Sequence, residues 1–173
     1  KLHKNFSSKK KGSNNREKAR ISLSKEYKKV TNKRRDYFFK LANKLTREYS
    51  YIFIEDLNLR GWKKLWGRKT SDIAIGEFFS ILEHQGTKNS CVVHKIDRFF
   101  ASSKLCYECG WKKKDLQLSD RVFECKICGH IEDRDLNASK NIKREGSSSL
   151  RLDDVRLPNL GSNCCLILES TIN

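Results

Sequence analysis

Two short stretches of the sequence, CYECG at residues 106–110 and CKICG at residues 125–129, each contain a pair of cysteines separated by two residues. A two-residue gap lets both sulfurs of one turn face a single ion. The 15 residues between the pairs are long enough for a hairpin that brings the second pair to the same ion. This spacing predicts a zinc ribbon with four ligands: Cys106, Cys109, Cys125 and Cys128.

The residue after each pair supports the same interpretation. Gly110 and Gly129 can adopt the positive φ that turns backbone N–H groups toward the thiolates. Four thiolates leave no open position, so the zinc is structural and the ribbon depends on it for folding. The alternatives are four unrelated cysteines, or a ligand role for His130. The other three cysteines, at positions 91, 164 and 165, have no metal-ligand spacing.

The net charge of the chain points to a polyanionic partner. The 173 residues include 37 Lys and Arg against 21 Asp and Glu, a formal charge of +16. Residues 1–50 hold 17 of the basic residues and four acidic ones, so this stretch contributes +13 and the remainder +3. Each phosphate that a basic side chain neutralises releases condensed counterions, which favours binding to nucleic acid. A soluble basic protein without such a partner is the alternative.

The basic segment has the pattern of a loop followed by a long helix. Residues 1–15 are rich in Lys, Ser, Gly and Asn and predict a loop. Apolar residues recur mostly three or four positions apart over about 16–49, which predicts an amphipathic helix. A basic helix face is often only a solvated surface, but the scarcity of acidic neighbours favours contact with phosphates. The residues predicted to bind nucleic acid are Lys9, Lys10, Lys11, Arg16, Arg20, Lys28, Lys29, Lys33 and Arg35.

The rest of the chain predicts alternating strands and helices around the cysteines. Residues 49–55 (YSYIFIE) are β-branched and aromatic without strict alternation, which is typical of a strand covered on both faces. Further segments are predicted in this order: a loop at 56–70 with Trp62 and Trp66, a helix at about 71–85, a strand at 91–96, a helix starting near Asp135, and a frayed tail from Gly146.

Three carboxylates stand at the ends of these elements. Glu55 closes the apolar strand and is followed by Asp56, so it should be buried or half-buried and in need of a partner. Taken alone, it is most simply a hydrogen-bonded strand terminator. Asp133 and Asp135 lie at the start of the helix after the cysteines, where either suits an N-cap. Together these carboxylates could instead hold divalent ions for phosphodiester hydrolysis.

Several of these motifs resemble those of one known family. The run IEDLN at 54–58, SSKLCYECG at 102–110, RVFECKICG at 121–129 and DRDLNASKNI at 133–142 resemble the carboxy-terminal half of the TnpB (OrfB) proteins of bacterial insertion sequences. The basic stretch SKKKGSNNREKARISL at 8–23 is also similar to the family's basic segment. The resemblance spans about residues 8–144 in the family's order, and compact type V CRISPR nucleases share the same core.

The resemblance implies an α/β fold, a partial RNase H-like core of RuvC type with the four-cysteine zinc ribbon inserted before its last catalytic element. The implied organisation has four parts: a basic helix with a partial nuclease core at 1–100, the zinc ribbon at 101–132, the last catalytic element at 133–145, and a poorly ordered tail at 146–173.

The resemblance also assigns roles to individual residues. Such sites use an Asp on an early strand, a Glu that ends a later strand, and an Asp that opens a helix after the ribbon. Glu55 matches the second and Asp135 the third, whereas Asp133 is assigned to capping or support and Arg134 to phosphate or carboxylate contact. No segment before residue 49 matches the early strand. Because the chain starts at Lys1 and contains no Met, we expect a piece of a longer protein, with the first Asp upstream.

The function implied is that of a transposon-encoded, RNA-guided DNA endonuclease, which this chain alone is not expected to perform. The expected cofactors are structural Zn²⁺ and, in the complete protein, catalytic Mg²⁺. The expected partners are DNA and a guide RNA, with no membrane and no small-molecule substrate. The expected location is the nucleoid-associated cytoplasm, as part of a prokaryotic mobile element. Two alternatives are a non-catalytic zinc-ribbon module that binds nucleic acid and a transposase that performs strand transfer.

Overall fold

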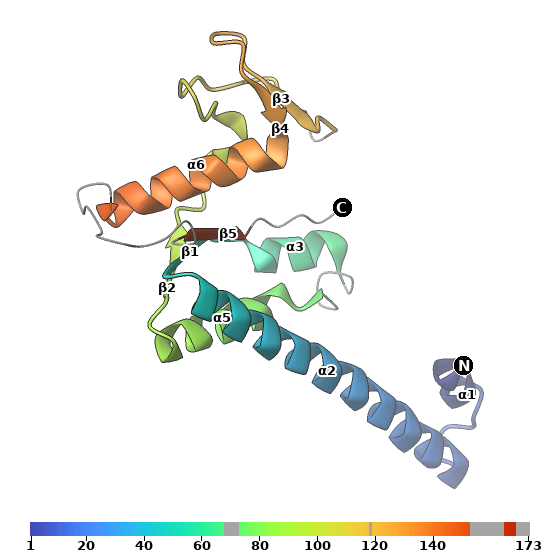
Figure 1. Cartoon of the computed structure of the whole chain (residues 1–173). Helices are drawn as coiled ribbons and strands as arrows, with labels where there is room; N and C mark the ends of the chain where they lie inside the picture. The colour runs from blue at the N-terminus through green and yellow to red at the C-terminus, as the bar shows by residue number, and fades with distance from the viewer. Residues whose placement is uncertain (68–72, 118, 153–164, 169–173) are drawn as a thin grey trace. The chain divides into compact units, whose positions relative to one another are not determined.

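The computed structural model describes residues 1–67, 73–117, 119–152 and 165–168. The chain divides into two compact units, Lys1–Leu41 and Ala42–Asn173. The first unit contains helix α1 (Leu2–Ser7) and most of helix α2 (Asn14–Glu48). The second unit contains the end of α2 and every later element (Figure 1). None of the described helices combines the length and apolar character needed to cross a bilayer.

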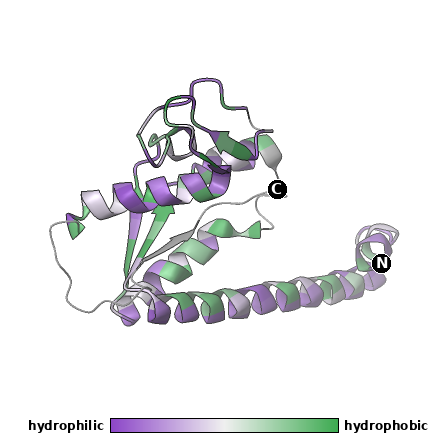
Figure 2. Cartoon of the chain, turned by 45° about the horizontal axis from the view of Figure 1, so that its top comes forward, coloured by the Kyte–Doolittle hydropathy of each residue, from purple (hydrophilic) through white to green (hydrophobic). Residues whose placement is uncertain are grey.

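The first unit is held together by contacts between α1 and α2. The guanidinium of Arg16 lies 4.3 Å from the centre of the Phe6 ring, and its Nη1 donates a hydrogen bond of 2.9 Å to the Lys9 carbonyl. The His3 and Tyr27 rings meet edge to face. These contacts explain α1, which the local sequence did not predict: residues 1–15 contain this helix as well as a loop. Figure 2 shows hydrophilic residues along most of α2.

The second unit is built on a parallel three-stranded sheet. Strand β1 (Tyr51–Glu55) lies between β2 (Val92–Ile96) and β5 (Cys165–Leu168), and both pairings are parallel. Ile52, Phe53 and Ile54 are fully buried, which confirms a central strand covered on both faces. Parallel neighbours need a crossover connection, and residues 56–91 supply it between β1 and β2.

The crossover contains two helices, α3 (Leu59–Trp66) and α5 (Ile75–Lys88). The prediction of a loop over 56–70 was therefore wrong for residues 59–66. The Asn58 side chain caps α3 by accepting a hydrogen bond of 3.0 Å from the Gly61 N–H, which satisfies a donor at the helix start despite the glycine. At the end of α5, Asn89 donates hydrogen bonds to Asn43 and Thr46 and ties this helix to the end of α2.

Helix α6 (Arg134–Ser149) covers one face of the sheet, and α5 lies on the opposite side (Figure 1). Ile142 of α6 packs with Phe53 and Ile96 in the core. Gly146 lies against Phe53 so closely that a Cβ atom at this position would be 2.1 Å from the ring. Helix α6 continues to Ser149, so the tail predicted from Gly146 was wrong for residues 146–149 and for β5. Residues 153–164 and 169–173 of that tail lie outside the described part of the chain.

Residues 102–133 form what we call the cysteine segment, which follows β2 and precedes α6 in the chain. It starts with a 3-10 turn, η1 (Ser102–Lys104), and contains the antiparallel pair β3 (Val122–Glu124) and β4 (Ile131–Asp133). Its own small core consists of Cys106, Phe123 and Cys125, against which Trp111 packs. Strand β4 leads directly into α6, so the cysteine segment and the sheet are joined through one helix.

Replacement of Gly146 by Ala should destabilise the second unit. The added methyl group would overlap the Phe53 ring, and overpacking of this kind costs about 2 kcal/mol even though Ala favours helix. Urea unfolding of the zinc-loaded chain measures the change. Gly76→Ala in α5 is the matched control, because its Cβ would meet only a mobile Leu59 methyl group at 3.2 Å. Equal stability of the two variants would contradict the packing described here.

Candidate metal centre and acidic pocket

The four predicted zinc ligands lie together. The sulfur atoms of Cys106 and Cys128 are 3.7 Å apart, those of Cys109 and Cys125 are 3.6 Å apart, and all four lie within 4.8 Å of one another. A tetrahedral zinc ion with Zn–S bonds of about 2.3 Å requires sulfur separations of about 3.8 Å. The donor set and its spacing therefore fit a zinc ion.

Two similar turns present the thiolates. In each, the glycine N–H donates to the carbonyl of the first cysteine of the pair, from Gly110 to Cys106 and from Gly129 to Cys125, at 2.9 and 3.0 Å. Both glycines have positive φ, 75° and 74°, as the sequence predicted. The thiolates of each pair therefore face the same point because the backbone turns in the same way twice.

The thiols differ in acidity before any metal binds. Burial raises the pKa of Cys125, but backbone N–H groups of Cys128 and Ile127 point at its sulfur and bring the pKa down to about 6. At Cys128 a backbone N–H from His130 favours the thiolate, yet burial and hydrogen bonds with the other cysteines raise the pKa to about 12. Burial also raises the pKa of Cys106. A metal ion must therefore displace protons from some of these thiols when it binds.

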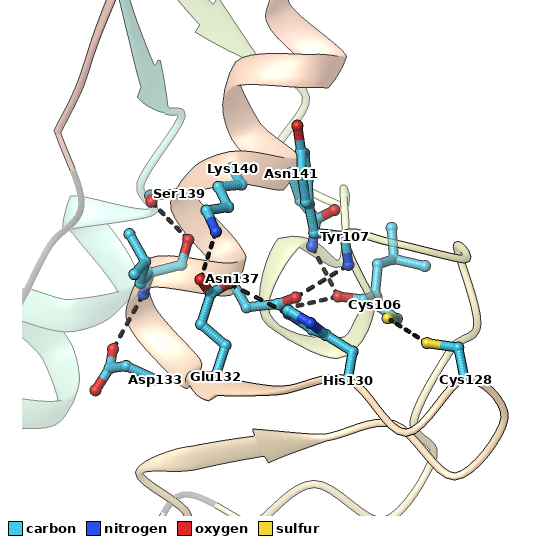
Figure 3. Close-up of polar contacts among 12 residues, drawn as sticks. Cys106, Tyr107, Cys128, His130, Glu132, Asp133, Asn137, Ser139, Lys140 and Asn141 are labelled. Carbon is cyan, nitrogen blue, oxygen red and sulfur yellow. Dashed lines mark hydrogen bonds and ion pairs between the residues drawn. The ribbon is translucent and has the colours of Figure 1, made fainter.

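Two buried amides on α6 hold the segment that carries Cys106 (Figure 3). Asn137 donates from Nδ2 to the Leu105 carbonyl at 2.7 Å and accepts at Oδ1 from the Tyr107 N–H at 3.0 Å. Asn141 donates from Nδ2 to the carbonyls of Leu105 and Ser102, at 2.7 and 3.0 Å. The first zinc ligand is thus fixed between two residues whose backbone is bound to α6.

An ion pair braces the junction of β4 and α6. Glu132, at the end of the cysteine segment, accepts a hydrogen bond from Lys140 Nζ, and its second oxygen lies 3.4 Å from His130 Nε2 (Figure 3). The Lys140 hydrogen bond holds the pKa of Glu132 below its usual value against the effect of burial. In the structure His130 therefore contacts Glu132 and lies outside the four-cysteine group.

A second candidate site lies at the carboxyl end of the parallel sheet. Glu55 is half-buried at the end of β1 and accepts a hydrogen bond of 2.6 Å from Ser102 Oγ. It lines a cavity of about 230 Å³ together with Asp56, Asn58, Trp62 and Asp97, among others. Asp56 is paired with Arg98 at 2.6 Å. Asp97 accepts from the Phe99 N–H at 2.7 Å.

The other predicted acidic residues lie at the start of α6. Asp133 is the N-cap, since its Oδ1 accepts from the backbone N–H groups of Asp135 and Leu136 at 2.9 and 3.0 Å. Asp135 is half-buried, and the Arg134 guanidinium lies 3.3 Å from its Oδ1. Arg134 therefore contacts a carboxylate. Across the described residues, the four cysteines are the only His, Cys, Asp or Glu cluster of three or more that could share an ion. The structure does not place Glu55 and Asp135 in such a group.

The predicted nucleic-acid-binding residues are not equivalent. Arg16 packs on Phe6 within the first unit, and Arg35 lies 5.9 Å from the Phe39 ring. Arg20 and Lys29 are paired with Glu17 and Glu26, each at 2.6 Å. Acidic neighbours are few in the sequence, yet Glu17, Glu26 and Asp36 are each engaged by a basic residue of α2. Exposed residues of the predicted set include Lys10, Lys11, Lys28 and Lys33.

The sequence analysis missed Ser102, Asn137, Asn141 and the pair Asp56–Arg98. One signal was available for the two amides: Asn137 and Asn141 are four residues apart, beside the apolar Ala138 and Ile142, so they share the buried face of the helix. Ser102 carried no such signal, because Ser103 stands next to it.

Comparison with known proteins gives two family matches. Residues 1–65 match the family model described as a probable transposase (OrfB_IS605), and residues 76–142 match the Cas12f1-like TNB domain. A "Putative RNA-guided DNA endonuclease" of Streptomyces pristinaespiralis is 38% identical over 156 residues, which cover 89% of this chain and 39% of the relative. The TnpB-like protein L79 of Acanthamoeba polyphaga mimivirus is 33% identical over 150 residues, 82% of this chain and 27% of the relative.

One solved structure is also similar to this chain. It is a cryo-EM structure of the Cas12f1-sgRNA-target DNA complex, with a TM-score of 0.48 and 20% identity, covering 72% of this chain and 38% of that one.

The fold and the cysteines define an α/β protein with a thiolate site suited to a metal ion. Its two halves match two different family models, residues 1–65 the first and residues 76–142 the second. The chain is a relative of TnpB-like proteins and of proteins described as RNA-guided DNA endonucleases, and it contains a segment that matches the Cas12f1-like TNB domain. It spans well under half of the length of the curated relatives described above.

Replacement of Cys106 by Ser should remove the metal and unfold the cysteine segment. The chain should purify with one zinc ion, and the variant with almost none, since a ribbon this small depends on its ion for folding. Elemental analysis and the amide dispersion of residues 105–133 in NMR spectra measure both effects. Cys91→Ser is the matched control, because Cys91 is buried outside the cluster. Zinc retained at full occupancy in Cys106→Ser would overturn the assignment.

Proposed function

We propose that this chain supplies the zinc ribbon and two metal ligands of an RNA-guided DNA endonuclease with a RuvC-type core. The observation that carries the proposal is the half-buried Glu55, which ends a buried parallel strand and lines a polar cavity. A carboxylate in this position is costly unless it is paired or binds a cation. The similarity to relatives described as RNA-guided DNA endonucleases supplies the reaction class.

Glu55 and Asp135 would hold Mg²⁺, which supplies charge stabilisation to the attacking and leaving oxygens of phosphodiester hydrolysis. Glu55 has a fixed donor on one oxygen, Ser102, which leaves the other oxygen for a cation. Asp135 follows its capping neighbour Asp133 and lies in the first turn of α6. A third carboxylate is not assigned in this chain, so we propose that cleavage requires further residues of the complete protein.

The basic surface of α2 would hold nucleic acid through its phosphates. Contacts to phosphate fix the position of a strand without reading its sequence, and base pairing with a guide would provide specificity. The exposed Lys28 and Lys33 are better placed for this role than Arg20 and Lys29, which already have acidic partners. On this proposal DNA and a guide RNA are the partners.

A binding module without catalysis is the second candidate. It is favoured by the fact that the thiolate cluster and the basic helix are each complete within the described residues, whereas the carboxylates do not form a shared site. Strand transfer is a third candidate, since residues 1–65 match the probable transposase family. Joined transposon ends produced in a reaction without any other recombinase would favour it over hydrolysis.

Loss of either proposed magnesium ligand should abolish cleavage. The test uses a chimera in which this chain replaces the matching part of the Streptomyces pristinaespiralis relative, and the unmodified chimera must first show guided cutting. Glu55→Gln and Asp135→Asn should each lower its rate by more than about a hundredfold, because even indirect partners of metal ligands cost 10–100-fold. Binding to target DNA should persist.

Asp133→Asn is the control for these two variants, because an amide oxygen can still cap α6. Its cutting rate should stay close to that of the unmodified chimera. If Asp133→Asn were as damaging as Asp135→Asn, the roles of the two aspartates would have to be exchanged. Normal cutting by Glu55→Gln would remove Glu55 from the proposed site.

Removal of two exposed lysines from α2 should weaken binding to all nucleic acids alike. Each lost phosphate contact lowers the slope of log affinity against log salt by about 1, so Lys28→Ala/Lys33→Ala should lower it by about 2. Filter binding of the chain to single- and double-stranded DNA at several salt concentrations measures the slope. Lys63→Ala/Lys64→Ala is the charge-matched control in α3. An equal loss in both variants would indicate net charge rather than a surface on α2.

A further inference from the structure

Ser102 connects two parts of the chain that are far apart in sequence. It is buried at the first position of η1, and its Oγ donates a hydrogen bond of 2.6 Å to Glu55 Oε1 across 47 positions. A hydroxyl that donates to a carboxylate makes a shorter and stronger hydrogen bond than one between neutral groups. The Glu55 carboxylate is therefore oriented from the base of the cysteine segment.

The position of Ser102 is in turn set by α6. Asn141 is fully buried and donates to the carbonyls of Ser102 and Leu105. Its neighbour one turn earlier, Asn137, is also fully buried and binds Leu105 and Tyr107 on either side of Cys106 (Figure 3). We call Ser102, Asn137 and Asn141 the α6 clamp. Through it, one helix face fixes both the first zinc ligand and the hydroxyl on Glu55.

Burial of two amide side chains stabilises a helix contact less than burial of apolar side chains would, because the amides lose their hydration. A buried polar side chain adds little net stability even when its hydrogen bonds are satisfied, and it destabilises the fold when a partner is missing, so apolar residues would pack this face with less risk. Their specific effect is directional, because the Nδ2 group of each amide donates to carbonyls at fixed positions and Asn137 Oδ1 accepts from the Tyr107 N–H. The clamp therefore serves geometry more than stability.

We propose that Ser102 is a positioning residue for Glu55, that Asn141 and Asn137 hold it in place, and that occupancy of the four-cysteine site is thereby coupled to the orientation of the Glu55 carboxylate. The proposal rests on the proposed function, in which Glu55 binds a cation. One oxygen of Glu55 is held by Ser102, and Glu55 lines the same cavity as Asp56, Asn58 and Asp97, so on this proposal its second oxygen binds a cation there. Without the hydroxyl, the carboxylate can rotate away.

A luminescent cation tests the positioning role in the chain itself. Tb³⁺ binds carboxylate oxygens, and Trp62, which lines the cavity with Glu55, can transfer excitation energy to it. The part of the titration that Glu55→Gln removes reports the site at Glu55. Ser102→Ala should weaken that part about tenfold, as loss of an indirect partner of a metal ligand does. Ser103→Ala, the matched control on the same turn, should leave it unchanged.

The amides and the zinc ion provide a second arm. Asn141→Asp preserves volume but removes the donor to Ser102, so it should weaken Tb³⁺ binding in the same direction. Removal of zinc should also weaken it in the unmodified chain, with little further loss in Ser102→Ala, because both changes act through the clamp. If zinc removal weakened Tb³⁺ binding by the same factor in Ser102→Ala as in the unmodified chain, the zinc site would not act through this serine.

A measurement without a cation separates the inference from the proposed function. If Glu55→Gln left Tb³⁺ binding unchanged, the cation site at Glu55 would be wrong. The clamp would then be judged by side-chain scalar couplings of Glu55 in NMR spectra. These should indicate one rotamer in the unmodified chain and Ser103→Ala, and averaging in Ser102→Ala and Asn141→Asp. A single Glu55 rotamer in correctly folded, zinc-loaded Ser102→Ala would overturn the positioning role.

Discussion

The buried amides of Asn137 and Asn141 are the constraint on which the arrangement of the second unit depends. Strand β4 ends the cysteine segment and leads into α6 without a linker, so the carboxyl end of the segment is fixed to α6 by the chain itself. The position of the segment then depends on what holds its amino end. The two amides hold that other end by binding the backbone from Ser102 to Tyr107. Both ends of the cysteine segment are thus fixed to one helix.

The same helix also determines how the sheet is packed. Ile142, directly after Asn141, and Gly146, about one turn further on, both meet Phe53 of β1, so the apolar contacts of α6 follow its polar contacts along the helix. A change in the position of α6 would therefore act on the thiolate site, on Ser102 and on the central strand together. Rigid packing of this kind transmits a displacement because a close-packed interior cannot absorb it locally.

Local sequence predicted those features whose cause is local. The two CxxCG repeats bring four sulfurs together because turn geometry is set within five residues, and the apolar run before Glu55 is buried because of its own composition. The helices α1 and α3 were missed. Helix α1 is held by Arg16, which belongs to another helix. Helix α3 contains Gly61, which disfavours a helix in the sequence, although its N–H donates to the capping side chain of Asn58. The hydrogen bond from Ser102 to Glu55 joins residues 47 positions apart, and nothing in SSK separates Ser102 from Ser103.

The placement of the acidic residues has a physical consequence for any reaction at this site. Asp56 is held by Arg98 and Asp133 is used to cap α6, so each already has a stabilising partner within the fold. Within the described part of the chain, Glu55 has a neutral donor, Ser102, on one oxygen, whereas Asp135 has the Arg134 guanidinium 3.3 Å from its Oδ1. A divalent cation binds most strongly where the carboxylate charge is least compensated, since a paired carboxylate must first lose its partner. Among these four carboxylates, Glu55 is therefore the one that neither pairs with a basic side chain nor caps a helix within the described residues. Its charge is the least compensated of the four, which supports the proposal that it is the first of them to bind a cation.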